Sequence, residues 1–557
     1  MSTAGARPQG AAGWILPICA PYVLVVIRHH LDCLYILQLE RYKPDRYHRW
    51  LGLSRRLIVP WGEFWLQALV VGVTNVVVQS GMPWLVAYIL WVSGGWVILQ
   101  RQARLQVSQR FQWTARGVRV AVAAFAVSGA LAVGAGLVQG SATGPMSAVG
   151  RVVAGAVSGL ALAGILSPFA VLLAAYVLQP IERRIARGYL AQAEGRMRSY
   201  PGRVLGITGS YGKTTTKFIT ATLLEARYRV LKTPDGVNTT MGIVRVIRED
   251  LRDEHEVFVV ECAAYGPGEI REVCDIVRPQ LGILTAVGVQ HLERFGTPER
   301  IAEAKYELLA ALPPGGVAVV NADDATCLQL AERARAEGKR VLLYGLGAEG
   351  TALAVRGTDV QVSARGTSFR VRTAGGESAG FETRMLGRWN LSNILGGMAA
   401  AVEWGVPLEA LRPAVAALTP APRRLEIREE GGIIKILDVA NANPRGAEMA
   451  LEVLGQFTGG QRILITPGMV ELGPVEAEEN RKLGRLAAGV CDYVVLVGPE
   501  QTRPIRQGLA DRGFPAERIR IARLADEVAD HLGGLVKPGD ILLFENRLPD
   551  TYLEVRR

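Results

Sequence analysis

The chain has 557 residues, which is enough for three or four domains, and a net charge of +11. Its basic residues gather beside apolar runs and not along a soluble face, which favours a membrane surface and excludes nucleic acid as the expected partner. The six cysteines are scattered without a Cys-x-x-Cys pair, which argues against a zinc knuckle or a disulfide framework and indicates a reducing, cytosolic setting for the soluble part.

The first third of the chain is predicted to be membrane-embedded. Four stretches contain no Asp, Glu, Lys or Arg, namely residues 64–79, 82–99, 120–138 and 152–178. Since a helix needs about 20 apolar residues to span a bilayer, the third stretch fits directly, the first two form a tight hairpin, and the fourth tilts and kinks at Pro168. A weaker fifth stretch, 14–27, contains two prolines and is open to three interpretations: a span, a re-entrant segment or an interfacial helix. It has no persuasive cleavage site, so we do not interpret it as a signal peptide.

Basic segments alternate with these stretches. Seven Lys or Arg residues lie in 28–62, five arginines in 100–119 and five more in 180–200. The positive-inside rule places all three segments in the cytoplasm, which predicts a multi-pass protein of the cytoplasmic membrane. The stretches contain few polar residues and no ion pair or acidic relay, so an anchor or a holder of a lipid-linked substrate is favoured over a transporter.

A glycine-rich run follows at residues 206–216, with the sequence Gly-Ile-Thr-Gly-Ser-Tyr-Gly-Lys-Thr-Thr-Thr. It stands behind an apolar stretch, 204–207, and ahead of a helix-like stretch, 214–225. A strand–loop–helix of this kind presents backbone N–H groups and a helix N-terminus to phosphate. The spacing is shorter than the strict Walker pattern, because Ile207 stands where that pattern requires glycine. The run predicts a nucleotide loop formed by Gly209, Ser210, Tyr211, Gly212, Lys213, Thr214 and Thr215, with Lys213 on the terminal phosphates and Thr214 on Mg²⁺.

From residue 201 onward, apolar β-like runs alternate with amphipathic helical patterns, which is typical of an α/β fold. Glu261 follows the strand-like run 256–260, and His291 follows the apolar run 281–287. Ligands of open α/β sheets bind at the carboxyl ends of strands, so Glu261, His291 and the phosphate loop are predicted to converge at one edge. A carboxylate and an imidazole there suit a second Mg²⁺ or its surroundings.

Several segments, in this order, resemble the Mur ligases, the family that builds the stem peptide of peptidoglycan. They are the loop at 206–216, then 259–270 with Glu261, 289–296 with His291, 302–305 with Lys305, 386–393 with Asn390 and Asn393, 423–426 with Arg424, and 438–444 with Asp438 and Asn441. The resemblance covers 201–557. It implies ATP and Mg²⁺ as cofactors and amide-bond formation through an acyl phosphate. The runs at 438–444 and 467–473 are most similar to the MurF branch of the family, which adds D-alanyl-D-alanine.

The resemblance also implies a role for each matching residue. The catalytic set is Lys213, Glu261, His291 and Lys305. Thr214 and Glu261 would hold one Mg²⁺, and His291 would hold or position a second, which Lys305 would support once that lysine is carbamylated. The remaining nucleotide contacts would come from Asn238 facing the phosphates, Asn390 and Asn393 beside the base, Arg424 on phosphate, Asp438 on ribose, and Asn441 in the same run.

The chain departs from the family pattern in three places. No domain that grips a UDP group precedes residue 201, so the expected muropeptide acceptor is either UDP-linked or lipid-linked, and membrane lipid is an expected partner. The C-terminal run 544–550, Phe-Glu-Asn-Arg-Leu-Pro-Asp, stands where the MurF branch has Lys-Gly-Ser-Arg, and Leu437 replaces an acidic residue. The incoming amine is therefore left as an amino acid or a D-Ala-D-Ala-type dipeptide.

The predicted architecture is an α-helical transmembrane domain of four or five helices at 1–180 and a basic amphipathic connector at 181–200. A central ATP-binding α/β domain follows at 201–419, with a β excursion at 352–384, and a Rossmann-like α/β domain closes the chain at 420–557. Two other functions stay open: a membrane ligase similar to poly-γ-glutamate synthetases, and a non-catalytic nucleotide-binding scaffold for envelope machinery.

Overall fold

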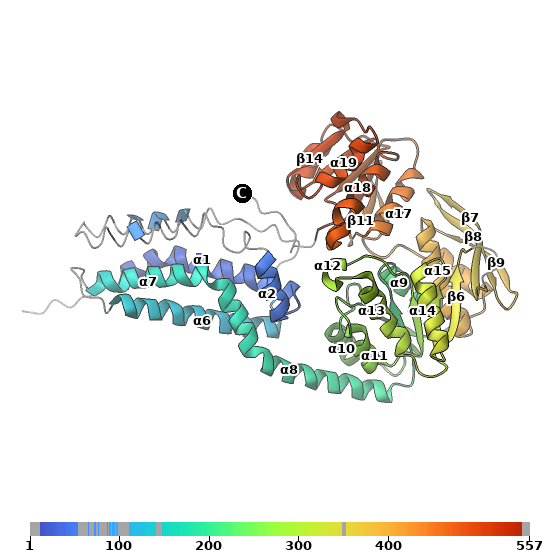
Figure 1. Cartoon of the computed structure of the whole chain (residues 1–557), viewed down its shortest axis with the longest axis horizontal. Helices are drawn as coiled ribbons and strands as arrows, with labels where there is room; N and C mark the ends of the chain where they lie inside the picture. The colour runs from blue at the N-terminus through green and yellow to red at the C-terminus, as the bar shows by residue number, and fades with distance from the viewer. Residues whose placement is uncertain are drawn as a thin grey trace, which may run out of the picture. The chain divides into compact units, whose positions relative to one another are not determined.

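The computed structural model describes residues 12–53, 111–140, 148–347, 352–440 and 442–548, with isolated residues between 65 and 97. The chain divides into two compact units, and the boundary falls between Ile185 and Ala186. The described residues of the first unit form helices, and the second unit contains two β-sheets with helices packed on them (Figure 1).

The described part of the N-terminal unit is helical. Its helices are α1 (Ala12–Leu39), α2 (Pro44–Leu53), α6 (Ala115–Gly140), α7 (Ala148–Ile165) and the start of α8 (Ser167–Ser199). Helix α7 packs against both α1 and α6. By length and composition two described helical segments can cross a membrane, Cys19–Leu39 and Ala115–Ala135, and Gly155–Ile165 with Ser167–Ser199 forms a pair bent by 69° that adds a third candidate.

The described helices can be compared with the apolar stretches predicted from the sequence. The predicted stretch 120–138 lies within α6, whereas 64–79 and 82–99 fall mostly outside the described residues. The predicted stretch 152–178 is divided at Leu166, with Pro168 in the first turn of α8.

Residues 14–27 lie within α1, which continues to Leu39, and the overlapping segment Cys19–Leu39 is a candidate span. The candidate span Cys19–Leu39 therefore includes Arg28, His30 and Asp32, which lie beyond the apolar stretch 14–27. His30 is fully buried. Its Nδ1 lies 2.9 Å from Ser167 Oγ and its Nε2 lies 2.9 Å from Ser128 Oγ, so one imidazole joins α1, α6 and α8.

The middle domain of the second unit is built on a nine-stranded sheet in the order β2-β3-β1-β4-β5-β6-β7-β8-β9. The strands are β1 (Arg203–Thr208), β2 (Val230–Lys232), β3 (Val257–Glu261), β4 (Leu281–Leu284), β5 (Val317–Asn321), β6 (Arg340–Gly345), β7 (Val355–Ser363), β8 (Gly366–Thr373) and β9 (Ser378–Thr383). Pairing is parallel from β2 to β7 and antiparallel from β7 to β9. The β excursion expected at 352–384 is confirmed as the antiparallel extension of this sheet.

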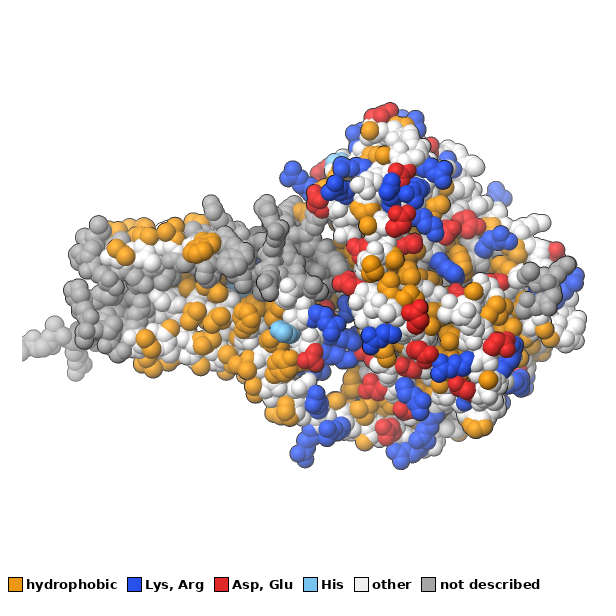
Figure 2. Space-filling view, in the orientation of Figure 1, with side chains coloured by type: hydrophobic (Ala, Val, Ile, Leu, Met, Phe, Trp, Pro, Cys, Tyr) orange, Lys and Arg blue, Asp and Glu red, His pale blue; other side chains and the backbone are white. Residues whose placement is uncertain are grey.

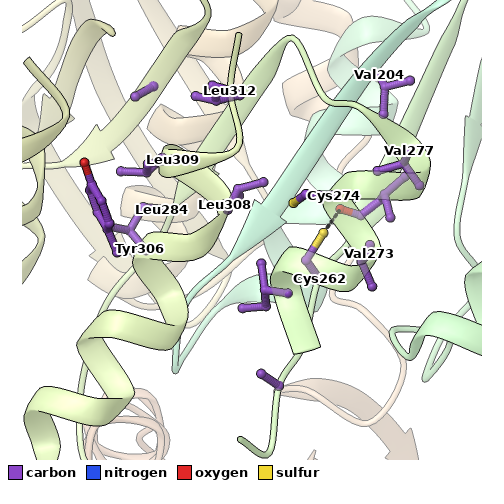
Figure 3. Packing of buried hydrophobic residues seen from close by; sticks show 14 of the residues in the cluster. Val204, Cys262, Val273, Cys274, Val277, Leu284, Tyr306, Leu308, Leu309 and Leu312 are labelled. Carbon is purple, nitrogen blue, oxygen red and sulfur yellow. Dashed lines mark hydrogen bonds between the residues drawn. The ribbon is translucent and has the colours of Figure 1, made fainter. Parts of the chain in front are cut away.

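Two apolar cores cover the two faces of the sheet. One core contains side chains of α10 (Thr240–Glu249), α11 (Glu269–Val277), α13 (Pro298–Ala310) and α14 (Ala325–Ala336), and the other contains those of α9 (Lys213–Leu224), α15 (Arg388–Glu403) and α16 (Arg412–Ala416). Figure 3 shows part of the first core, which contains Val273 and Cys274 of α11, Leu308 of α13 and Val204 of β1. Cys262, directly after β3, lies in the same core and donates a weak hydrogen bond to the carbonyl of Val260.

The last turns of α8 also belong to this core. Ala193 and Met197 are buried in it, and Arg196 forms an ion pair with Asp253 at 2.8 Å. After the helix, Tyr200 donates a hydrogen bond to the carbonyl of His255 at 2.9 Å. The end of the long helix is therefore fixed to the middle domain by packing as well as by the chain itself.

The C-terminal domain has a six-stranded sheet in the order β10-β11-β15-β12-β13-β14, in which only β10 is antiparallel. Its strands are β10 (Glu426–Glu430), β11 (Ile433–Asp438), β12 (Arg462–Thr466), β13 (Tyr493–Val497), β14 (Ile519–Ala522) and β15 (Ile541–Glu545). Its helices are α17 (Pro444–Gly455), α18 (Glu476–Ala487), α19 (Arg503–Asp511) and α20 (Val528–Leu532). A parallel sheet with crossover helices is the Rossmann-like arrangement expected for this part of the chain.

Candidate active site

The phosphate loop connects β1, which ends at Thr208, to α9, which begins at Lys213. Two of its glycines have positive φ angles, 149° for Gly209 and 78° for Gly212. A Cβ at Gly209 would lie 2.1 Å from Thr285 Oγ1, and one at Gly212 would lie 2.5 Å from Asn393 Oδ1. Both conformation and space therefore require glycine, and the loop leaves the N-terminus of α9 at the cavity, where it favours a bound phosphate.

Lys213 is the first residue of α9 and folds back over the loop. Its Nζ donates to the carbonyl oxygens of Gly209 at 2.7 Å and Ser210 at 3.0 Å. Burial lowers its pKa to about 8, although the nearby Glu261 carboxylate opposes this shift. Phosphate oxygens would supply stronger acceptors than the loop carbonyls, so this lysine suits the role expected from the sequence.

Glu261 is the last residue of β3 and is fully enclosed. Its Oε1 accepts hydrogen bonds from Thr214 Oγ1 and Asn238 Nδ2, each at 3.0 Å, and its Oε2 lies 3.0 Å from Lys217 Nζ. Burial alone would raise the pKa of Glu261, but the charge of Lys217 and the hydrogen bond from Asn238 outweigh it and hold the pKa below its ordinary value. The carboxylate is therefore ionised beside a hydroxyl.

This pair of oxygen donors fits Mg²⁺. The described residues contain no cluster of three or more His, Cys, Asp or Glu side chains able to hold a metal. Mg²⁺ does not need one, because it binds through one or two carboxylates together with phosphate oxygens and water. Thr214 and Glu261 supply that kind of incomplete oxygen site directly beside the phosphate loop.

His291 lies at the N-cap of the short helix α12 (Leu292–Phe295) with a φ of 60°. Its Nδ1 is hydrogen-bonded to Glu471 of the C-terminal domain. Burial lowers the pKa of His291, against the opposing effect of Glu471. A neutral imidazole at this place is able to bind a metal ion.

Lys305 lies on α13 and is buried, with no hydrogen-bond partner for its Nζ among the described residues. Burial lowers its pKa to about 7, and the positive charge of Lys213 contributes. Carbamylation needs an unprotonated amine, and a lysine with this pKa supplies one near neutral pH. The environment of Lys305 therefore supports the expected modification.

The side chains expected at the nucleotide base and ribose line a cavity next to the one that contains Glu261 and His291. Asn390 is buried and donates to the carbonyl of Leu386 at 2.8 Å, while Asn393 Oδ1 accepts from Thr216 Oγ1 at 3.1 Å. Arg424 reaches over from the C-terminal domain and donates from Nη2 to Thr214 Oγ1 at 3.1 Å. Burial raises the pKa of Asp438, at the end of β11, to about 6.

Two adjoining cavities collect most of the expected residues. The first is lined by Tyr211, Gly212, Thr215, Asn390, Asn393, Arg424 and Asp438. The second is lined by Ser210, Tyr211, Gly212, Lys213, Thr214, Asn238, Glu261, His291, Lys305 and Arg424. Gly209 lines neither cavity and acts through the backbone, and Asn441 lies outside the described residues.

Three residues near the cavities have no expected role from the sequence. Lys217 is fully buried, one helical turn after Lys213, and binds Glu261 and the carbonyl of Pro234. Glu471 contacts His291, and Arg445 lies over the ring of Trp389 at 4.8 Å in the nucleotide-side cavity. The four-residue spacing of Lys213 and Lys217 on one predicted helix was a usable signal for Lys217.

Comparison with known proteins agrees with this geometry. Residues 207–401 match the Mur ligase middle domain, and residues 423–545 match the Mur ligase glutamate ligase domain. The chain belongs to the Mur ligase family. Members of this family are ATP-dependent ligases that form carbon–nitrogen bonds.

Among its relatives are enzymes named UDP-N-acetylmuramoyl-tripeptide–D-alanyl-D-alanine ligase. The Escherichia coli relative is 30% identical over 302 residues, which cover 54% of this chain and 65% of the relative; the Bacillus subtilis relative is 29% identical over 346 residues, covering 62% and 72%. The chain thus spans about two thirds of the length of these relatives.

Solved structures of MurF also resemble this chain. The structure from Acinetobacter baumannii has a TM-score of 0.59 at 26% identity and covers 65% of this chain and 78% of its own. The structure from Thermotoga maritima, solved in complex with ADP, has a TM-score of 0.57 at 26% identity and covers 66% and 81%. These Mur ligase neighbours support the MurF-like assignment made from the runs at 438–444 and 467–473.

Proposed function

We propose that this Mur ligase is a membrane-anchored, ATP-dependent amide ligase of peptidoglycan precursor synthesis. It would join a muropeptide carboxylate to the amine of a D-Ala-D-Ala-type compound. The observation that carries the proposal is the convergence of Lys213, Thr214, Glu261, His291 and Lys305 on one cavity beside a glycine-rich phosphate loop. A scaffold without catalysis has no need for this charged set.

The reaction would proceed in two steps. An oxygen of the acceptor carboxylate attacks the γ-phosphorus of ATP, the bond to the β–γ bridging oxygen breaks, and an acyl phosphate and ADP form. The amine then attacks the acyl carbon, inorganic phosphate leaves, and the nitrogen loses a proton to give the amide. Positioned cations and N–H groups stabilise the charge that develops on the transferred phosphoryl group.

The residues divide this work among them. Lys213 and the backbone N–H groups at the start of α9 would bind the phosphate oxygens, and Arg424 would add a positive charge from the C-terminal domain. Mg²⁺ held at Thr214 and Glu261, with His291 and carbamylated Lys305 beside it, would neutralise phosphate charge. Closing the C-terminal domain over the cavity would exclude water from the acyl phosphate.

The N-terminal unit supports a membrane location and a lipid-linked acceptor. Figure 2 shows exposed hydrophobic side chains across the described surface of its helices, and charged side chains across the ligase domains. Exposed apolar residues of α6 and α8 include Val122, Val133, Leu137, Phe169, Leu173 and Val177. A protein held at the bilayer could meet an acceptor already attached to lipid, although a UDP-linked acceptor suits the same ligase chemistry.

The test is an acceptor screen with the full-length protein in lipid bilayers. ATP and D-Ala-D-Ala would be supplied with either a UDP-linked or a lipid-linked muramoyl tripeptide, and phosphate release and product mass would be measured. We expect a condensed product, formed faster from the lipid-linked acceptor. Lys213→Ala should lower turnover by about 100- to 1,000-fold, because it removes one positioned cation from the transition state. ATP binding without product from either acceptor or any amine would favour the scaffold instead.

A further inference from the structure

Glu471 of the C-terminal domain contacts the middle domain at the candidate metal site. It lies in the loop between β12 and α18, is buried, and has a φ of 66°, which is the left-handed region. Its carboxylate is hydrogen-bonded to His291 Nδ1, and its other oxygen accepts from Arg294 Nη2 at 3.0 Å. Its backbone carbonyl accepts from the N–H of Glu293 at 3.2 Å. A glutamate in this strained conformation persists because these contacts hold it.

The contact fixes which nitrogen of His291 is available to a ligand. An ionised carboxylate only accepts hydrogen bonds, so Nδ1 must carry the proton and donate it to Glu471. The remaining nitrogen, Nε2, then has the lone pair. His291 lines the cavity that also contains Thr214 and Glu261.

The side chains of Tyr265 and Arg294 also surround the imidazole of His291. The ring of Tyr265 lies 4.7 Å from that of His291, and the guanidinium of Arg294 lies 4.9 Å from the Tyr265 ring. Arg294 thus contacts both Glu471 and Tyr265. The imidazole has a defined orientation as well as a defined tautomer.

We propose that Glu471 is a positioning residue that presents Nε2 of His291 to the metal ion, and that docking of the C-terminal domain thereby completes the metal site. This inference rests on the proposed function. Carboxylates that accept from the second nitrogen of a metal-binding histidine orient the ring and strengthen it as a ligand. Here that carboxylate comes from a domain other than that of the histidine, so metal affinity is linked to domain closure.

The experiment uses Mn²⁺ in place of Mg²⁺ with the full-length protein, in the presence of a non-hydrolysable ATP analogue. Electron paramagnetic resonance would give both the Mn²⁺ affinity and the coupling to the imidazole nitrogen of His291. We expect Glu471→Ala to weaken Mn²⁺ binding by about 10- to 100-fold and to remove the nitrogen coupling. Glu471→Gln keeps an acceptor oxygen for Nδ1–H and should retain most of both signals.

Two further variants make the result specific. His291→Ala should lose the same coupling, and adding Glu471→Ala to it should cause no further loss, because the glutamate acts only through the histidine. Glu448→Ala removes an exposed carboxylate from the same domain and should leave affinity and coupling unchanged. Circular dichroism would confirm that each variant is folded.

Unchanged Mn²⁺ affinity and nitrogen coupling in a folded Glu471→Ala variant would overturn the inference and reduce this residue to a domain contact. The proposed function stands or falls separately, because metal binding is measured without any acceptor or amine. Absence of ligation with every acceptor, together with the expected Mn²⁺ results, would reject the proposed function and leave the metal arrangement intact.

Discussion

The two units bury their polar groups in opposite ways. In the unit Ala186–Leu548 the cores are apolar, and the buried charges, such as Lys217 and Glu261, lie beside the cavities. In the N-terminal unit many large apolar side chains are exposed, while His30, Ser128 and Ser167 lie inside, at most 3% exposed. An apolar interior is favoured where the surroundings are water, and an apolar exterior with hydrogen-bonded polar groups inside is favoured where they are lipid.

Both units bury an ionised group beside a cation, Glu261 with Lys217 and Glu182 with Arg119, and the N-terminal unit also buries a neutral hydrogen-bonded group. The ligase unit buries ionised groups, which are strongly destabilising when one partner is removed. The described N-terminal helices join His30 to two neutral serines, and hydrogen bonds of this kind contribute about 1 kcal/mol each. Substituting one buried polar group in each unit therefore tests whether such groups also contribute different free energies of folding in the two units.

The largest effect is expected at Lys217. Lys217→Met removes the positive partner of Glu261 from a fully enclosed pair and should lower the free energy of unfolding by about 3–5 kcal/mol, because the carboxylate stays buried without its counter-ion. Chemical denaturation of the full-length protein in detergent, followed by the signal of the ligase unit, would measure this loss.

The control is Lys232→Met, which removes a more exposed lysine 3.5 Å from Glu225 and should cost no more than about 1 kcal/mol. A loss of stability at Lys217 as small as that at Lys232 would show that water reaches the Lys217–Glu261 pair. The ligase unit would then gain no more free energy from its buried ion pair than from an exposed one.

A smaller, pH-dependent effect is expected at Glu545, a buried carboxyl at the end of β15. Burial raises its pKa to about 8, and its Oε2 accepts from Thr466 Oγ1 at 2.6 Å. Between pH 4.5 and 8 the folded protein holds a proton that the unfolded chain releases, so stability from this group is present at low pH and is lost as the pH rises.

The side chain of the Glu545→Gln variant cannot ionise, so the variant should not lose stability as the pH rises. The stability of the variant relative to the natural protein should therefore increase by about 3 kcal/mol between pH 5 and pH 7, at about 1.4 kcal/mol per pH unit. Denaturation at the two pH values checks it, with Glu448→Gln as an exposed control. A pH-independent difference between Glu545→Gln and the natural protein would show that this carboxyl is ionised in the fold.

The sequence predicts well those features that depend on neighbours along the chain. The phosphate loop, Glu261 after one strand and His291 after another are read from local patterns, and strand ends of a parallel sheet meet at one edge. The cavity that joins them follows from that rule. The same holds for the β excursion, whose alternating residues fit short strands.

Features that depend on distant partners are missed. Glu471 is 180 residues from His291, and their contact exists only when two domains dock. The length of α1 is missed for another reason: Pro17 and Pro21 are helix breakers in water, but α1 passes through both. Prolines are better tolerated in helices packed in a membrane, where neighbouring groups satisfy the freed carbonyls.

The smallest effect is expected at His30. His30→Leu removes the acceptor or donor for Ser128 and Ser167 in the interior of the N-terminal helices, which should cost about 1–2 kcal/mol, because Ser167 keeps its bond to the carbonyl of Ala163. Adding Ser128→Ala removes the hydroxyl left without its partner and should recover part of the loss. The loss of monodisperse protein on heating in detergent would measure both. Two outcomes would contradict this expectation: a cost at His30 above that at Lys217, or no recovery in the double variant. Either would show that the N-terminal helices depend on buried polar groups as strongly as the ligase unit does. The two units would then differ only in where their polar groups lie.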